Sequence, residues 1–350
     1  MNYTTLNISH REITIKKKRL EYIDTCKIYD SRLEDPQKTM NDVDYKTYKQ
    51  IAVDIPRTMP EFKVFSYDKI RKLMLRVLFI WSMRHPASGY VQGFNDLISP
   101  FVAVFLIDQI NNYRNKNKLN NVTNDSSLNE KKNEKKNEKT IEKMNEKTIE
   151  KTIDKQNLQN DQKSIETKEV DLYALDFSED FMAENGITED VLESMEADIY
   201  WCFSKMMDKI QSNYTNNQPG LQKMMSKLEE IIKLLDPELV KHLQLNEVSF
   251  IQFSFRWMNC YLMREFSLKL IIRLWDTYFS EENAFNNFHL FVCACFLLNF
   301  GDKIKKLDFS NTILFLQNLP TDLWTISDLE VLLAKSYQAS VMYGNCSFLK

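Results

Sequence analysis

The chain has 350 residues, of which 43% are hydrophobic and 12% aromatic, enough to bury a large core as one big domain or two ordinary ones. Its 46 basic and 49 acidic residues give a net charge of −3, which indicates neither a nucleic-acid partner nor a membrane surface. The longest apolar runs are too short or too interrupted to span a bilayer, and the polar, charged N-terminus shows no signal-peptide pattern. We therefore expect a cytoplasmic protein with no integral membrane segment.

The first segment with a chemical signature is a helix that ends beside an arginine. The apolar positions at helical spacing are Tyr45, Tyr48, Ile51, Ala52 and Ile55. Pro56 disfavours the α conformation at Ile55, so we expect the helix to end there. Asp54 then lies in the last turn, where a carboxylate gains from a nearby cation such as Arg57. Asp54 is therefore predicted to hold Arg57 ready, although a surface ion pair at a helix end has the same pattern.

A second segment, residues 85–96, connects two predicted helices. It contains Gly89 and Gly93, two of only six glycines in the chain, and such clustering indicates backbone strain or close approach. Gln92 is therefore predicted to lie in a tight, glycine-flanked connection, with Tyr90 as a packing residue. A simple helix-to-helix turn with an incidental glutamine is the alternative.

The composition changes near residue 111 and recovers near residue 187. Residues 111–171 are rich in Asn, Lys and Glu and have almost no aromatic side chains. Such a segment cannot bury enough apolar area to offset its ordering entropy. We therefore predict a disordered or transiently helical, low-complexity insertion over residues 111–186, which leaves the end of the helix that contains Pro100.

After the insertion, amphipathic helical patterns follow one another. They cover residues 191–210, 220–235, 248–263, 268–278, 288–300, 311–316 and 327–337. No alternating run is long enough for a sheet. The pattern predicts an all-α, two-lobed domain in which residues 1–110 and 187–215 form the N-terminal lobe and residues 216–350 form the C-terminal lobe.

Residues 248–263 stand out because nearly every side chain is aromatic or aliphatic, and we predict one core helix here. Its aromatic stripe consists of Phe250, Phe253, Phe255 and Trp257. This stripe could form a ligand box, but packing in the core is the better prediction.

Cysteine and histidine usage indicates no special chemistry. Six cysteines are scattered through apolar patterns, which is typical of reduced core thiols. The four histidines show no ligand spacing with them, so no metal site is predicted. We also find no P-loop, nucleophile elbow or pair of metal-binding carboxylates, and therefore expect no hydrolytic activity of its own.

The two polar segments fit two short patterns. Residues 51–57 fit I-x-x-D-x-x-R and residues 90–93 fit Y-x-Q-G, so that Gln92 follows Arg57 by 35 residues. In this order and spacing they resemble the two-finger signature of TBC-domain GTPase-activating proteins. The stretches that share the resemblance are residues 51–58, 85–100, 196–221, 250–268 and 272–281. They look most like the member 22 branch of the family.

The resemblance implies that the chain accelerates GTP hydrolysis by a Rab-family GTPase in trans and is not an enzyme in its own right. Arg57 would be the arginine finger, and Gln92 the glutamine finger that acts in place of the Rab's own glutamine. The accompanying positions are Asp54 as the orienting carboxylate, Tyr90 and Gly93 as residues that shape the glutamine loop, and Asn95 and Asp96 without an assigned role. The chemistry fits, because this reaction needs phosphoryl charge neutralised and an attacking water held in line.

The resemblance also concerns partners and location. It implies that the partner is a Rab in its GTP state, which itself holds GTP and Mg²⁺, so that the chain needs no cofactor of its own. Relatives in this branch are associated with the Golgi. This association implies a cytoplasmic role in vesicle trafficking, with peripheral attachment to the Golgi through partners.

One feature departs from the family pattern. TBC domains usually open with an arginine and a tryptophan four residues apart, a little before the first finger, and here the first tryptophan is Trp81. It is therefore open whether the first helix or two of the family pattern are present. The alternatives to an active GAP are a catalytically idle TBC scaffold that binds a Rab or another Golgi protein, and an unrelated α-helical adaptor in which both motifs are coincidental.

Overall fold

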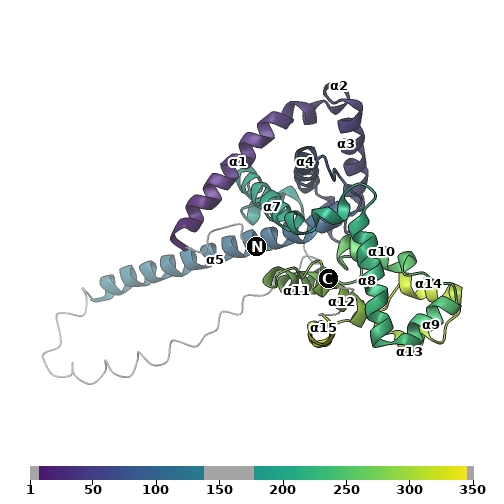
Figure 1. Ribbon diagram of the computed structural model, residues 1–350. Helices are drawn as coiled ribbons and strands as arrows, with labels where there is room; N and C mark the ends of the chain where they lie inside the picture. The colour runs from purple at the N-terminus through teal and green to yellow at the C-terminus, as the bar shows by residue number, and fades with distance from the viewer. Residues whose placement is uncertain (1–7, 138–176, 345–350) are drawn as a thin grey trace, which may run out of the picture. The chain divides into compact units, whose positions relative to one another are not determined.

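The computed structural model describes residues 8–137 and 177–344. Every regular element within these ranges is a helix, as Figure 1 shows, which confirms the predicted all-α fold. The chain divides into two compact units, the first formed by Met1–Phe105 and Glu189–Lys350 and the second by Leu106–Thr188. The division of the domain into two lobes stays a prediction. None of the helices in the described ranges is long and apolar enough to cross a membrane.

The first unit begins with a group of helices around α7. Its members are α1 (Ile8–Glu34), α2 (Pro36–Thr39), α3 (Asp42–Asp54), α4 (Asp68–Arg84) and α7 (Glu189–Ile210), with the 3-10 turns η1 (Ile55–Arg57) and η2 (Lys63–Ser66) between α3 and α4. α1 and α4 both pack against α7, and α3 packs against α4 (Figure 1). Because α4 and α7 each bury a long apolar face, they form the core of this group.

α1 is a helix that the sequence did not predict. Its buried side chains are Tyr22, Thr25 and Cys26, so it lacks the aliphatic stripe by which amphipathic helices are recognised. Polar contacts attach it to α7: the Tyr22 hydroxyl donates to Glu196 Oε1 at 2.6 Å, and Arg19 forms an ion pair with α7. A helix therefore does precede α3, although the 350-residue sequence has no tryptophan ahead of α3.

The remaining helices of the first unit pack around α12. They are η3 (Gln211–Tyr214), α8 (Pro219–Leu235), α9 (Pro237–Leu245), α10 (Ile251–Cys260), α11 (Leu268–Ser280), α12 (Phe288–Leu298), α13 (Gly301–Ile304), α14 (Phe309–Gln317) and α15 (Ile326–Tyr343). α12 contacts both α8 and α15, and residues 289–297 are all buried. The apolar face predicted for α8 is buried at Leu221, Met224, Met225, Leu228, Ile231 and Ile232.

The core helix predicted over residues 248–263 is shorter than expected. α10 ends at Cys260 because Tyr261 and Leu262 adopt left-handed backbone conformations, with φ of 49° and 62°. Both side chains are fully buried, so tertiary packing stabilises a turn that no local pattern signals. Phe255 is 38% exposed, so the prediction that it packs in the core was wrong. The other members of the stripe are buried as predicted: Phe250, Phe253 and Trp257.

α5 (Phe94–Asn137) starts in the first unit and continues into the second. It extends beyond residue 111, where the insertion was predicted to begin, and the Lys and Glu residues of this stretch are good helix formers. In the second unit, the Ser178 hydroxyl caps α6 (Glu179–Glu184) by accepting from the Phe181 N–H at 3.1 Å. The rest of the predicted insertion, residues 138–176, lies outside the described residues.

The five cysteines that the structure describes are buried, and none of them forms a disulfide, which agrees with the predicted core thiols. Burial raises the pKa of Cys26 and the pKa of Cys202 to about 12, so both thiols stay protonated at neutral pH. Cys346 lies outside the described residues.

A buried ion pair joins α4 to α7. Glu196 is 3% exposed, and Arg76 donates to its two carboxylate oxygens at 2.6 and 2.7 Å. Replacing Arg76 by methionine keeps most of the packing of its stem but leaves the Glu196 carboxylate buried without a cation. We expect Arg76→Met to lower the free energy of unfolding by about 3 kcal/mol, measured by urea denaturation.

The matched control is the double variant Arg76→Met/Glu196→Gln, which removes the buried charge and keeps an acceptor for the Tyr22 hydroxyl. It should recover part of the lost stability because no carboxylate is left without a cation. Equal losses in the single and double variants would show that Arg76 contributes by packing and not by its charge.

Candidate functional site

The arginine loop, residues 55–58, follows α3 and carries Arg57. Ile55 keeps an α-region backbone (φ −55°, ψ −48°) although Pro56 follows, so the chain turns once more in η1 and does not leave the helical conformation at Ile55 as expected. Pro56 is tolerated because the first turn of a helix needs no backbone donor at that position. The Thr58 N–H closes the turn by donating to the Ile55 carbonyl at 3.0 Å. Arg57 is the last residue of η1, and its side chain is exposed.

The guanidinium of Arg57 has no hydrogen bond or ion pair to another residue in the described ranges. Asp54, which we expected to hold it, is 7% exposed and accepts from the Tyr90 hydroxyl at 3.0 Å. Burial, and then the nearby Asp54 carboxylate, raise the pKa of Tyr90 well above its usual value, so the hydroxyl stays a donor. The Tyr90 ring packs edge-on against Phe94, with centroids 5.9 Å apart. Asp54 thus connects α3 to the loop that carries Gln92.

The glutamine loop, residues 85–93, connects α4 to α5 in a tight turn. The Gly89 N–H donates to the His85 carbonyl at 2.8 Å, and Gly89 and Gly93 have φ of 60° and 108°. These are conformations that favour glycine, as the clustering of glycines in this segment predicted. Gln92 is exposed between them.

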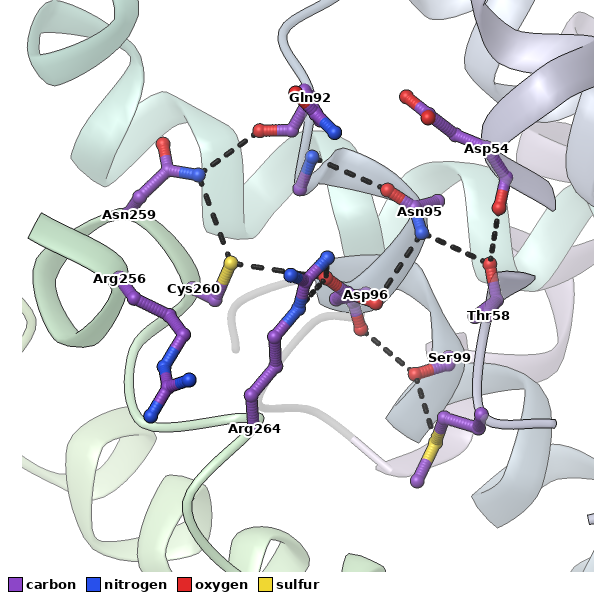
Figure 2. A network of polar contacts seen from close by, with 12 residues as sticks. Asp54, Thr58, Gln92, Asn95, Asp96, Ser99, Arg256, Asn259, Cys260 and Arg264 are labelled. Carbon is purple, nitrogen blue, oxygen red and sulfur yellow. Dashed lines mark hydrogen bonds and ion pairs between the residues drawn. The ribbon is translucent and has the colours of Figure 1, made fainter. Parts of the chain in front are cut away.

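Asn95 connects the arginine loop to the glutamine loop. Asn95 is 2% exposed, and three of the four hydrogen-bonding positions of its carboxamide have a partner of their own. Nδ2 donates to Thr58 Oγ1 at 3.0 Å and to Asp96 Oδ1 at 3.2 Å. Oδ1 accepts from the Gly93 N–H at 3.2 Å and lies 3.3 Å from the Tyr90 hydroxyl. Figure 2 shows Asn95 with Thr58 on one side and Asp96 on the other.

Asp96 connects this network to the segment after α10. It is 5% exposed, and Arg264 contacts its Oδ2 through Nε at 2.8 Å and Nη2 at 2.7 Å. Burial raises the pKa of Asp96, and the Arg264 cation opposes that rise. The Cys260 thiol lies 3.8 Å from the same oxygen, and burial raises the pKa of Cys260 to about 12, so the neutral thiol faces the carboxylate.

Two residues of the site were not predicted from the sequence, Asn259 at the end of α10 and Arg264 just after it. Asn259 Nδ2 donates to the Gln92 carbonyl at 2.9 Å, and Arg264 pairs with Asp96. Figure 2 shows both side chains reaching the network from the side opposite Thr58. The available signal was the family resemblance of residues 250–268, which assigned no role to these positions.

Arg57 and Gln92 border the same cavity, which has a volume of about 460 Å³. Other residues that line it include Asp54, Asn95, Asp96, Met263, Arg264 and Phe266. The structure therefore brings five predicted polar side chains to one cavity, those of Asp54, Arg57, Gln92, Asn95 and Asp96. The Tyr90 hydroxyl and the Gly93 N–H lie in the hydrogen-bond network that joins the loops. No group of His, Cys, Asp or Glu residues in the described ranges is arranged to hold a metal ion.

The fold and the site define a class of protein: an all-α domain that presents the exposed side chains of Arg57 and Gln92 to a shared cavity. The family model of the Rab-GTPase-TBC domain matches residues 6–111 and 104–305. The chain belongs to this family.

Curated relatives and a solved structure agree with this assignment. TBC1 domain family member 22A of Macaca fascicularis is 37% identical over 98% of this chain and 55% of its own length. The GTPase-activating protein gyp1 of Schizosaccharomyces pombe is 35% identical over 98% of this chain and 54% of its own length. The chain thus spans about half the length of these relatives. The crystal structure of the Ypt/Rab-GAP domain of Gyp1p is similar with a TM-score of 0.73 and 32% identity, covering 98% of this chain and 85% of that one.

Gly93 and Gly89 share a left-handed backbone but differ in their surroundings. A Cβ atom on Gly93 would lie 2.6 Å from Asn259 Nδ2 and 3.0 Å from Cys260 Sγ, whereas one on Gly89 would meet nothing within 4 Å. We expect Gly93→Ala to lower the free energy of unfolding by about 3 kcal/mol, because steric overlap adds to backbone strain. Gly89→Ala is the matched control, and its expected loss is about 1 kcal/mol from strain alone. Thermal unfolding compares them, and equal losses would exclude the contact with Asn259 as the cause.

Proposed function

We propose that this chain is a GTPase-activating protein for a Rab-family GTPase, and that it acts in trans through an arginine finger, Arg57, and a glutamine finger, Gln92. The observation that carries the proposal is that both side chains are exposed and border one cavity of about 460 Å³. Membership of the Rab-GTPase-TBC family supports it, as do relatives described as a GTPase-activating protein and as a Ypt/Rab-GAP domain.

Each of the two side chains suits one requirement of GTP hydrolysis. The Arg57 guanidinium stays charged at any working pH and would neutralise the charge that develops on the phosphoryl oxygens. The Gln92 carboxamide can donate to one partner and accept from the attacking water, and would do so in place of the Rab's own glutamine. The Rab would supply GTP and Mg²⁺. The residues that would hold the two loops without touching the nucleotide are Asp54, Tyr90, Gly93, Asn95 and Asp96.

Two finer parts of the proposal rest on the family resemblance alone. One is that the chain recognises the GTP-bound state of the Rab. The other is that it works in the cytoplasm at the Golgi surface, in vesicle trafficking, where partners attach it peripherally. Binding to GTP-loaded and GDP-loaded Rabs tests the first part, and imaging of the tagged full-length protein tests the second.

Single-turnover GTP hydrolysis by a panel of Rabs tests the two fingers. Arg57→Ala should lower the stimulated rate by about 10³- to 10⁵-fold, because the transition-state charge is no longer neutralised. Gln92→Ala should lower it by about 10²-fold, because the attacking water is no longer aligned. Both side chains are exposed, so neither variant should lose more than about 0.5 kcal/mol of stability.

Lys306→Ala and Gln244→Ala serve as controls, because they remove an exposed cation and an exposed amide that do not line the cavity. Both should stimulate hydrolysis like the unaltered chain. If the unaltered chain accelerates GTP hydrolysis by one of the Rabs and Arg57→Ala does not, the arginine-finger mechanism is established and that Rab is the substrate. If the folded chain binds a Rab but accelerates none, the idle TBC scaffold is the correct function.

A further inference from the structure

The peptide group between Gln92 and Gly93 is held at both of its polar ends by asparagine side chains. Its carbonyl accepts from Asn259 Nδ2 at 2.9 Å, and its N–H donates to Asn95 Oδ1 at 3.2 Å. Asn259 is 7% exposed and Asn95 is 2% exposed, so water has little access to these bonds. The peptide is therefore fixed from two helices at once, α10 and α5.

Fixing this peptide also restricts the direction in which the Gln92 side chain leaves the backbone. The peptide group is planar and includes the Cα atom of Gln92, so holding it in place limits the values that ψ of that residue can take. The Gln92 carboxamide itself has no hydrogen bond to another residue in the described ranges. Before a partner binds, the backbone is therefore what orients this long side chain.

The contact between Asn259 and the loop is close and rigid. Gly93 has φ of 108°, and a Cβ atom there would lie 2.6 Å from Asn259 Nδ2, so only glycine lets the two approach this far. The main chain of Asn259 is held as well, because its carbonyl accepts from the buried Tyr214 hydroxyl at 2.8 Å. The donor is thus presented to the loop from a fixed position.

The rest of the Asn259 side chain does little for stability. Its Oδ1 is buried and has no hydrogen-bond partner in the described ranges, which disfavours the folded state. The other contact of Nδ2 is with Cys260 Sγ at 3.6 Å, a weak acceptor. An apolar side chain would avoid the unpaired oxygen but would leave the Gln92 carbonyl without its donor. The bond to Gln92 is therefore the main contribution of this side chain.

We propose that Asn259 is a positioning residue for the glutamine finger. It acts through the backbone of Gln92, which lies 167 residues earlier in the sequence, and it does not touch the nucleotide. The inference rests on the proposed function, because a finger that is held ready matters only if it enters a partner's active site. A residue of α10 then contributes to the rate of hydrolysis without contributing to Rab affinity.

A double-mutant cycle with Gln92 tests this role. Asn259→Ala should lower the maximal single-turnover rate by about 10- to 100-fold, because a displaced finger aligns the water poorly. The affinity for the GTP-loaded Rab should change by less than about threefold, since the finger acts in the transition state. In the Gln92→Ala background the same change should cost less than about twofold, because no finger is left to position. Equal slowing in both backgrounds would overturn the proposal.

Asn286→Ala is the matched control for this cycle. Asn286 Nδ2 likewise donates to a backbone carbonyl far away in the sequence, that of Lys209, at 3.0 Å. Asn286 Oδ1 also accepts from Asn213 Nδ2 at 3.2 Å. Neither bond involves the glutamine loop, so Asn286→Ala should leave the rate unchanged, both in the unaltered chain and in the Gln92→Ala background. If Asn286→Ala slowed hydrolysis in the unaltered chain but not in the Gln92→Ala background, as expected for Asn259→Ala, the loss of any such asparagine bond would disturb the site. That result would contradict a specific role for Asn259.

Hydrogen–deuterium exchange tests the same bond without a Rab. Asn259→Ala should speed exchange of the amides of residues 89–94 by at least about tenfold while α8 and α12 exchange as before, because the glutamine loop alone is released. Unchanged exchange in the loop would overturn the proposal whatever the rates are. If the unaltered chain accelerates no Rab, the proposed function fails, and the exchange result still decides whether Asn259 orders the loop.

Discussion

The carboxamide of Asn95 is the group on which the arrangement of the site depends. It is buried and bonds to Thr58 of the arginine loop and to the Gly93 N–H of the glutamine loop. A buried polar group that loses its partner costs about 1–3 kcal/mol, so neither loop can shift without stranding a group that the other loop also uses. One amide thereby constrains the separation of the two loops that carry Arg57 and Gln92, and its bond to Asp96 extends the constraint to Arg264.

Aromatic packing gives this polar network a rigid base. Phe94 directly follows the glutamine loop and is fully buried. Its ring meets Trp81, Phe203 and Tyr214 edge-on, at centroid distances of 5.5, 6.0 and 4.9 Å. These contacts attach the start of α5 to α4, α7 and η3, and each adds about 0.5–1.5 kcal/mol beyond burial. The exposed Gln92 side chain thus stands on a loop whose end is held in place, which lowers the entropy lost on binding a partner.

Local rules predicted the parts of the molecule that depend on nearby residues. The apolar face of α8 and the strained glycines of the turn before α5 follow from spacing and backbone sterics, whereas Pro56 leaves Ile55 in the α region although α3 ends one residue before it. Asn259 was beyond such rules, because its bond to Gln92 joins residues 167 positions apart and depends on where α10 ends. α1 was missed for a related reason, since its buried face is made of Tyr22, Thr25 and Cys26 and gains its stability from contacts with α7.

The network also engages the two buried carboxylates that line the cavity beside Arg57, while the third carboxylate of that cavity, Glu61, is exposed. Asp54 bonds to the Tyr90 hydroxyl and Asp96 to the Arg264 guanidinium, so both buried acceptors are already engaged. A guanidinium that was paired with a buried carboxylate would have to break that pair before it could meet a phosphate, and would strand the carboxylate in doing so. Because Tyr90 and Arg264 already bond to these carboxylates, Arg57 has no such pair to break. The same two contacts that hold the glutamine loop in place therefore also keep the Arg57 guanidinium from pairing with Asp54 or Asp96. The position of the glutamine loop and the availability of Arg57 thus depend on one set of hydrogen bonds.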